Sequence, residues 1–246
     1  MNDAAGGVTE DALLGGRVRL AQPRGGYRVA IDPVLLAAAV PAKPGQTVLD
    51  VGAGTGAAAL CLAARVPGLA LTGIERDPAA LALSRRNGTD NGVAADWIEG
   101  DVLAPPAALL ARQFHHVMSN PPYRSVERGQ RSPLPERAAA HAIGDGDFAA
   151  WLAFCASRVR GGGTLALVLP AGEAARAVAL LEPRLSGITL FPLWPRRGAE
   201  AKRVILRARR GGRAPSRILP GLVLHEEDGY TAEAERVLRG GEALAF

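Results

Sequence analysis

The stretch TVLDVGAGTG, residues 47–56, joins an apolar run to a turn that contains three glycines. The apolar run suits a strand that is buried on both faces of a sheet. Gly52, Gly54 and Gly56 allow backbone conformations that other residues rarely adopt, and a helical pattern follows them directly. A glycine turn before a helix N-terminus lets a ligand approach the backbone where negative charge is favoured. This stretch therefore predicts an α/β domain with a ligand site at its first turn.

Patterns typical of strands and helices alternate through the rest of the chain. Further strands are expected at 69–75, 97–101, 114–120, 164–170, 188–193 and 201–209. Helices are expected from Pro78 to about Asn91, at 147–160 and at 171–185, with the glycines at 161–163 ending the second of these. Such alternation implies a mainly parallel sheet with helices on both faces. We expect one domain, with a core at 46–210, an N-terminal segment at 1–45 and a tail at 211–246.

The composition fits a single globular domain. A chain of 246 residues with 48% hydrophobic content can fill one core. No apolar run is long enough to span a membrane, and the start, MNDAAGG, lacks the charged and apolar regions of a secretory signal. Cys61 and Cys155 lie in apolar helical patterns, so buried thiols are expected and a disulfide is not. We expect a cytoplasmic protein without a membrane partner.

The histidines do not indicate a metal site. His115 and His116 fall in the strand at 114–120, so one is expected on each face, and no cluster of cysteine or histidine lies near them in the sequence. Packing is the expected role of both. His141 is expected in a solvated loop, and the sequence gives His225 no role. We expect no metal cofactor.

Positive charge is concentrated in three parts of the chain. The net charge is +5 and the isoelectric point is about 9.8. Residues 15–31 hold four arginines and no acid, residues 124–137 hold four arginines and two acids, and residues 194–217 hold nine basic residues and one acid. The first group is Arg17, Arg19, Arg24 and Arg28. Such clusters suit a polyanion such as nucleic acid, although any single arginine is more simply a solvated surface residue.

Two acidic residues stand at the ends of neighbouring strands. Glu75 ends the strand at 69–75, and Asp101 ends the strand at 97–101. Ligands of open α/β sheets bind at such strand ends, where Glu75 can accept hydrogen bonds from both hydroxyls of a ribose and Asp101 one from an adenine amine. Each carboxylate alone could equally cap a helix. The glycine spacing differs from the G-x-G-x-x-G of dinucleotide folds, which speaks against a nicotinamide oxidoreductase.

The sequence SNPPY, residues 119–123, follows the apolar strand pattern FHHVM. Two adjacent prolines cannot continue a sheet ladder, because each lacks an N–H and has a fixed φ. One interpretation is a simple proline turn with Tyr123 packed at its rim. A rigid strand end that places Asn120 near an aromatic ring indicates instead that a ligand or substrate group is held there.

With DVGAGTG, Glu75, Asp101 and NPPY at the ends of successive strands, residues 45–210 resemble the class I S-adenosylmethionine (SAM)-dependent methyltransferases. The resemblance implies a Rossmann-like, seven-stranded sheet whose last strand is antiparallel, with helices on both faces. It also implies that the methionine end of SAM lies over Asp50–Gly56, the ribose at Glu75 and the adenine at Asp101. The implied cofactor contacts are Arg28, Asp32, Asp50, Gly52, Gly54, Thr55, Gly56, Glu75, Arg76, Asp101, Val102 and Asn120.

In that family, Asn-Pro-Pro-Tyr after the fourth strand is typical of enzymes that methylate a planar amine, in adenine or in protein glutamine. The lone pair of such an amine is delocalised, so the enzyme must orient the nitrogen and favour its tetrahedral form. The resemblance implies that the Asn120 side-chain oxygen and the Pro121 carbonyl accept the two amine protons. Pro121 and Pro122 stiffen the motif, and Tyr123 stacks on the base, which is worth about 1–3 kcal/mol.

Two further segments, GYRVAIDPVLLAAAV (26–40) and PRRGAEAKRVILRARRGG (195–212), extend the resemblance to nearly the whole chain. The chain is similar to bacterial tRNA adenine-N6 methyltransferases that modify nucleotide 37 of a valine tRNA. Asp32 then has two candidate roles, beside the cofactor or as a helix cap before Pro33. We expect N6-methyladenine beside a tRNA anticodon, with the basic stretches on the RNA backbone. The alternatives are glutamine methylation of release factors, adenine methylation of ribosomal RNA or DNA, and RNA binding without catalysis.

Overall fold

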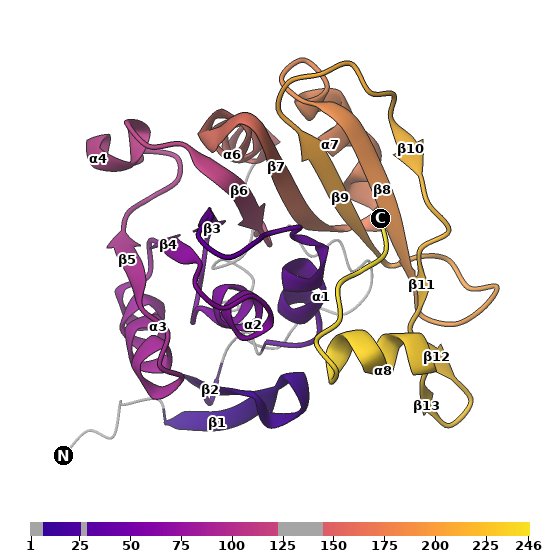
Figure 1. The fold of residues 1–246 in the computed structure, drawn as a ribbon, viewed down its shortest axis with the longest axis horizontal. Coiled ribbons are helices and arrows are strands. Elements are labelled where there is room, and N and C mark those ends of the chain that lie inside the picture. The colour runs from indigo at the N-terminus through magenta and orange to yellow at the C-terminus, as the bar shows by residue number, and fades with distance from the viewer. Residues whose placement is uncertain (1–6, 26–28, 123–144) are drawn as a thin grey trace.

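The computed structural model describes residues 7–25, 29–122 and 145–246. The first predicted strand is β3 (Thr47–Val51), which lies between β4 (Ala70–Glu75) and β6 (Phe114–Ser119) within a nine-stranded sheet (Figure 1). Val48, Leu49 and Val51 are fully buried, because helices cover both faces of the sheet at this strand. The continuous apolar run in the sequence reflects that central position.

The sheet has the strand order β10–β8–β9–β7–β6–β3–β4–β5, and β11 also pairs with β8. Its other strands are β5 (Ala95–Glu99), β7 (Val159–Pro170), β8 (Ser186–Trp194), β9 (Arg203–Arg209), β10 (Arg217–Ile218) and β11 (Leu222–Val223). β9 is antiparallel to both of its neighbours, and the other pairs of described strands in this sheet are parallel. The predicted sheet with an antiparallel last strand is confirmed, and β10 and β11 extend it beyond β8.

Helices cover both faces of the sheet, as predicted. One face carries α1 (Asp32–Ala39), α2 (Ala57–Arg65), α3 (Pro78–Asp90) and α8 (Ala232–Leu238), and the other carries α4 (Ala107–Leu110), α6 (Asp145–Arg158) and α7 (Ala174–Leu181). α7 is shorter than the predicted 171–185, because a 3-10 turn (Ala171–Glu173) precedes it. None of the described helices has both the length and the apolar character needed to cross a membrane.

The boundaries of α3 follow from its sequence. The Asp77 side chain accepts a hydrogen bond from the Ala79 N–H at 2.9 Å and caps the helix, while Pro78 occupies its first turn. Beyond the helix, Gly92 has a φ of +64°, a conformation that favours glycine after a helix end. The predicted helix from Pro78 to about Asn91 is confirmed.

The glycines at 161–163 do not end a helix, so that prediction is wrong. α6 ends at Arg158 and β7 begins directly with Val159, which places the glycines inside the strand. The register of β6 against β7 shifts at this point. A Cβ atom on Gly163 would lie 2.6 Å from the His115 carbonyl oxygen, so the close approach of the two strands requires glycine there.

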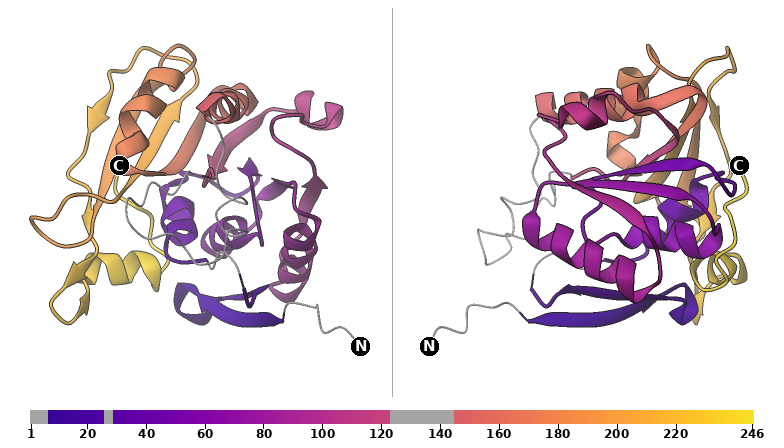
Figure 2. Two further views of the ribbon diagram at one scale, coloured as in Figure 1. Left: turned by 180° about the vertical axis from the view of Figure 1, so that it is seen from behind. Right: turned by 60° about the vertical axis from the view of Figure 1, so that its left-hand side comes forward.

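The N-terminal segment contains a β-hairpin that the sequence did not predict. β1 (Val8–Leu13) pairs antiparallel with β2 (Val18–Pro23), and a 3-10 turn (Leu14–Gly16) joins them. The hairpin lies beside α3, at the outside of the domain (Figure 2). Its buried residues join the same core as α1 and α2, namely Leu14, Val18 and Leu20.

The C-terminal tail packs against the same core. β12 (His225–Glu226) and β13 (Gly229–Tyr230) form a small hairpin before α8. Leu222, Val237 and Leu238 are buried with the residues of α1, and the Leu244 N–H donates to the Ala38 carbonyl at 2.9 Å. These contacts hold the end of the chain against α1.

Candidate active site

The residues expected at strand ends lie along one edge of the sheet. β3, β4, β5, β6 and β7 are parallel, so their carboxyl ends meet there, and we call this side the carboxyl edge. Asp50 is the residue before the end of β3, Glu75 ends β4, and Asn120 directly follows β6. β5 lies two residues earlier than predicted and ends at Glu99, so Asp101 follows it. The structure thus brings all four polar residues to neighbouring strands.

The glycine turn after β3 is held against β4 and fits tightly between two indole rings. The N–H groups of Gly52 and Ala53 donate to the Ile74 carbonyl at 2.9 and 3.0 Å. Gly52 and Gly56 have φ of +72° and +84°, which other residues adopt only with strain. A Cβ atom on Gly52 would lie 2.8 Å from the Trp151 ring, and one on Gly56 would lie 2.9 Å from the Trp97 ring. Conformation and space therefore both require glycine.

Glu75 holds the glycine turn in place through hydrogen bonds, in addition to its predicted role as the ribose ligand. Its Oε2 accepts the Gly54 N–H at 2.9 Å, and its Oε1 accepts the N–H groups of Arg76 and Asp77 at 2.8 and 2.9 Å. A carboxylate has about four acceptor positions, so Oε2 keeps capacity for a further donor. The sequence indicated the ligand role, and the contact with the turn is additional.

Two buried oxygens beside the turn have no hydrogen-bond partner among the described residues. They are Asp50 Oδ2 and Thr55 Oγ1, and Asp50 is only 3% exposed. Buried polar atoms in folded proteins are nearly always paired, so these two mark a place where a ligand with donor groups fits. Burial, with a smaller contribution from the Glu75 charge, raises the pKa of Asp50 to about 7, against the opposing effect of the Ala59 backbone N–H.

We expect Asp50→Asn to change the pH dependence of stability. Between pH 3.8 and about 7 the carboxyl is protonated only in the folded state, so the unfolded chain binds fewer protons and the free energy of unfolding falls as pH rises. A rise in the pKa from 3.8 to about 7 corresponds to at most about 4 kcal/mol. Denaturant unfolding at a series of pH values should show the wild type losing stability relative to the variant across this window. Parallel curves would contradict a protonated Asp50.

Asp101 and Val102 shape the turn after β5. The Asp101 Oδ1 accepts the Leu103 N–H at 2.9 Å, and its backbone forms a bridge with Ala104. Val102 is buried in the core cluster that also contains residues of α4 and α6. Asp101 therefore has a structural role beside its predicted adenine contact, and Arg76, also predicted beside the cofactor, is exposed.

Asp32 does not cap α1, so the capping interpretation is wrong. Ile31 occupies the cap position without a side-chain bond, and Pro33 follows Asp32 in the first turn. The Asp32 Oδ2 instead lies 3.3 Å from Nε of Arg203, at the start of β9. Because Asp32 already belongs to the first turn of the helix, its carboxylate is turned toward β9. Arg28 and Tyr123, with their predicted contacts, and His141, expected in a solvated loop, lie outside the described residues.

The end of β6 is tied to β3 and α6 directly before Asn120. The Ser119 hydroxyl donates to the Val51 carbonyl at 2.7 Å and accepts the indole N–H of Trp151 at 3.0 Å. Ser119 is fully buried, Asn120 is half-buried and Pro121 is buried. These bonds hold the backbone that presents the Asn120 side chain. Sequence reasoning missed Trp151, because its partners are distant in the chain.

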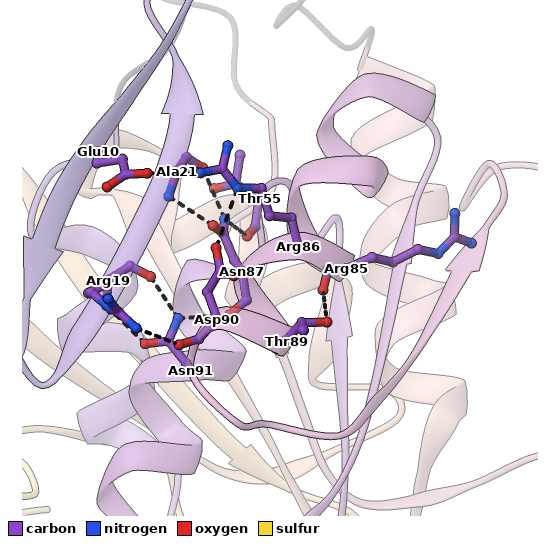
Figure 3. Close-up of polar contacts among 10 residues, drawn as sticks. All are labelled: Glu10, Arg19, Ala21, Thr55, Arg85, Arg86, Asn87, Thr89, Asp90 and Asn91. Atoms are coloured by element: carbon purple, nitrogen blue, oxygen red, sulfur yellow. Dashed lines mark hydrogen bonds and ion pairs between the residues drawn. The ribbon is translucent and has the colours of Figure 1, made fainter.

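Asn87 of α3 joins the N-terminal hairpin to the glycine turn (Figure 3). It is 1% exposed, and its Oδ1 accepts the Ala21 N–H at 2.8 Å. Its Nδ2 donates to the carbonyls of Ala21 and Thr55, both at 2.9 Å. One helical turn later, Asn91 exchanges the same pair of bonds with the Arg19 backbone at 2.9 and 2.7 Å. The two amides thus pair with alternate residues of β2, as a neighbouring strand would.

We expect Asn87→Ala to weaken SAM binding several-fold and to lower the free energy of unfolding by about 3 kcal/mol, since three buried hydrogen bonds are lost at about 1 kcal/mol each. Asn91→Ala is the matched control, because it also releases β2 but does not touch Thr55. Calorimetric titration should show a larger loss of SAM affinity for Asn87→Ala. Equal SAM affinities in the two variants would contradict a link from Asn87 to the turn.

His115, His116 and the two cysteines are structural, as predicted. His116 is 6% exposed and bonds to Thr164 and Gln46, each at 2.8 Å, and burial lowers its pKa to about 4. His115 bonds to the Thr47 hydroxyl on the partly exposed side of β6. Cys61 and Cys155 are buried free thiols, and burial raises the pKa of Cys61 to about 12. The described residues contain no cluster of His, Cys, Asp and Glu suited to a metal ion.

Comparison with known proteins places the chain among methyltransferases. The methyltransferase small domain matches residues 28–142. A tRNA1(Val) (adenine(37)-N6)-methyltransferase of Aeromonas hydrophila is 32% identical over 207 residues, which cover 82% of this chain and 84% of that protein. The chain belongs to the methyltransferase small domain family. The chain is therefore a methyltransferase that takes its methyl group from SAM, as the resemblance implied. This family membership is not compatible with a nicotinamide oxidoreductase.

One solved structure and one further relative are also similar to this chain. A crystal structure of a predicted O-methyltransferase from Agrobacterium tumefaciens matches the methyltransferase with a TM-score of 0.71 and 26% identity, over 87% of this chain and 98% of that one. A release factor glutamine methyltransferase of Deinococcus radiodurans is 43% identical, over 76 residues that cover 31% of this chain and 26% of that protein.

The unpaired buried oxygens of Asp50 and Thr55 fit SAM, because its methionine end carries a cationic ammonium group that can donate hydrogen bonds to them.

Proposed function

We propose that this methyltransferase transfers a methyl group from SAM to the N6 amine of adenine 37, beside the anticodon of a valine tRNA in the cytoplasm. The observation that carries the proposal is the 32% identity, over 82% of the chain, to an enzyme named for this reaction. The position of Asn120 at the carboxyl edge, next to the glycine turn, supports it.

In this proposal, two acceptors hold the target amine. The Asn120 side-chain oxygen and the Pro121 carbonyl oxygen accept its two hydrogens, which favours a tetrahedral nitrogen whose lone pair is no longer delocalised into the base. SAM supplies an electrophilic methyl group on its sulfonium sulfur. Transfer would break the bond between the methyl carbon and the sulfonium sulfur, and one of the two amine protons would pass to solvent. The products would be N6-methyladenine and S-adenosylhomocysteine. The bonds of Ser119 to Val51 and Trp151 support this geometry, because they hold the preceding backbone before substrate arrives.

The cofactor is proposed to bind over the glycine turn. Asp50 and Thr55 meet the methionine end with their unpaired oxygens. Glu75 accepts ribose hydroxyls with the acceptor capacity that the backbone N–H groups leave. Asp101 accepts from the adenine amine. An acidic group at the end of each of three neighbouring strands supports this order along the carboxyl edge.

The target adenine must be unpaired or flipped, since a base inside a stacked helix cannot reach Asn120. An anticodon loop presents such bases, with stem phosphates on either side. Tyr123 is proposed to stack on the base, and the arginines at 124–137 to meet the flanking nucleotides.

Glutamine methylation of release factors is the second candidate, because the same two acceptors suit a carboxamide nitrogen. The similarity to such an enzyme spans 26% of its length. That shorter match favours the adenine enzyme.

The test is to incubate purified protein with labelled SAM and separate pools of tRNA, ribosomal RNA, duplex DNA and release factor. We expect label in tRNA, recovered as N6-methyladenine, and loss of that nucleoside from the tRNA of a deletion strain. Label confined to release factor would overturn the proposal in favour of the glutamine enzyme. Label confined to ribosomal RNA or DNA would support adenine methylation but overturn tRNA as the substrate.

A further inference from the structure

The sheet divides the basic stretch at 194–217 between its two ends. β8 runs in the direction of β7, because β9 is antiparallel to both, so the loop between β8 and β9 lies at the carboxyl edge. β9 carries the chain back to the opposite edge, where the Gly187 N–H donates to the Ala214 carbonyl at 2.9 Å. The two loops lie at opposite ends of β8 and β9 (Figure 1). The stretch therefore forms two separate surfaces, although its sequence is continuous.

We propose that the loop at the carboxyl edge binds the phosphates beside the target nucleotide, and that the opposite loop does not. This inference rests on the proposed tRNA substrate. The loop carries Arg196, Arg197 and Lys202, which we call the edge cations. All three are exposed, and within the described part of the chain their side chains make no ion pair.

A hollow lies beside two of the edge cations, Arg196 and Lys202, and the tail contributes His225 to its lining. The hollow has a volume of about 570 Å³ and is lined by Pro195, Arg196, Ala199, Glu200, Ala201, Lys202 and His225. The His225 N–H donates to the Pro195 carbonyl at 3.0 Å, and its ring stacks on Tyr230 with centroids 4.6 Å apart. A concave surface with more basic than acidic side chains suits a phosphodiester backbone, which cations position without reading sequence.

The edge cations lie within reach of RNA that is bound at Asn120. Three strand spacings, from β6 through β7 and β9 to β8, separate Asn120 from β8 across the sheet, or about 14 Å. The register places Asn120 level with Phe191 of β8, so Arg196 lies five residues further along, or about 16 Å in the strand direction. The combined span of about 21 Å corresponds to roughly six nucleotides at about 3.4 Å per nucleotide along a stacked strand. The ion pair between Arg203 and Asp32 fixes the loop at its β9 end. The distance suits phosphates that flank a base held at the end of β6.

Several arginines elsewhere are engaged in holding the fold. Arg210, at the opposite edge, donates to the carbonyls of Ala156, Ser157 and Val159 at the end of α6. Arg207 lies over the Phe246 ring, 3.8 Å from its centroid. In the hairpin, Arg17 and Arg19 donate to the carbonyls of Arg239 and Asp90. These guanidinium groups are therefore held in contacts within the fold, whereas no such side-chain contact is found for the edge cations in the described part of the chain.

The experiment compares two triple variants that remove the same charge. Arg196→Ala, Arg197→Ala and Lys202→Ala remove the edge cations, while Arg209→Ala, Arg213→Ala and Arg217→Ala remove three exposed charges from the other loop, β10 and the end of β9. Binding of a valine tRNA transcript is measured at several KCl concentrations, together with SAM affinity and methyl transfer.

We expect the edge variant to bind the transcript on the order of tenfold more weakly, with the slope of log affinity against log salt reduced by about 2. Its KM for tRNA should rise, while SAM affinity stays unchanged and the opposite-edge variant behaves like wild type. Equal losses in the two variants, or an unchanged salt slope in the edge variant, would overturn the inference while tRNA methylation by the wild type stands. A wild-type protein that methylates no tRNA would instead overturn the proposed function, and this inference with it.

Discussion

Replacing Asn120 by alanine is expected to reduce methyl transfer on the order of 100- to 1000-fold, the loss that follows removal of an oriented hydrogen-bonding group from a reacting centre. The side chain directly follows β6, and its backbone is held by the bonds of Ser119. SAM affinity should change little, because Asp50 and Glu75 lie on other strands. Single-turnover rates at saturating tRNA and SAM, with calorimetric SAM titration, measure the two effects separately.

Asn120→Asp is the informative companion to this variant. The aspartate keeps an oxygen acceptor at the same place and loses the two amide donors. We therefore expect it to retain more activity than the alanine variant. Near-normal turnover in Asn120→Ala would contradict the assignment of Asn120 to the target amine. If the aspartate variant were as inactive as the alanine variant, the amide N–H groups rather than the oxygen would be the functional atoms.

Glu75→Ala should weaken SAM binding by about 10- to 100-fold, since charge-assisted hydrogen bonds are worth about 1.5–3 kcal/mol each. The effect has two sources. The variant loses the acceptor for ribose hydroxyls, and it also frees the Gly54 N–H, so the glycine turn is less well ordered before SAM arrives. Calorimetric titration of the folded variant measures the loss of affinity.

Asp77→Ala provides the control for Glu75. Asp77 is a carboxylate two residues further on, exposed, and bonded to the Ala79 N–H as the cap of α3. Its removal should cost about 1 kcal/mol of stability and leave SAM affinity nearly unchanged. Unchanged SAM affinity in a folded Glu75→Ala protein, equal to that of Asp77→Ala, would rule out Glu75 as a cofactor ligand.

The sheet and the strand-end residues could be predicted because local rules determine them. The apolar runs of β3 and β6 and the glycine turn are visible in any short window of sequence, and parallel strands bring their carboxyl ends together. The hairpin could not be predicted in this way. Its strand β2 pairs with the side chains of Asn87 and Asn91, which lie 66 to 72 residues further along the chain.

The charge pattern shows the same limit. Counting basic residues along 194–217 gave one stretch, whereas the reversal of direction at β9 separates its members by the length of a strand. The roles of Arg210 at carbonyl groups and of Glu75 at the Gly54 N–H likewise depend on tertiary contacts. Residue types in the sequence indicated where chemistry could occur. They did not show which charged side chains form hydrogen bonds within the fold.

Because the glycine turn fits tightly between two indole rings, the fluorescence of these two tryptophans is expected to respond to a ligand at the turn. Trp151 and Trp97 border Gly52 and Gly56. The third tryptophan, Trp194, ends β8, three strands away from β6 in the sheet, and donates to the Pro220 carbonyl. Indole emission responds to charge and polarity nearby, so SAM bound over the turn, as proposed, would act on two of the three tryptophans. We therefore expect SAM binding to change the intrinsic fluorescence, without a label and without turnover.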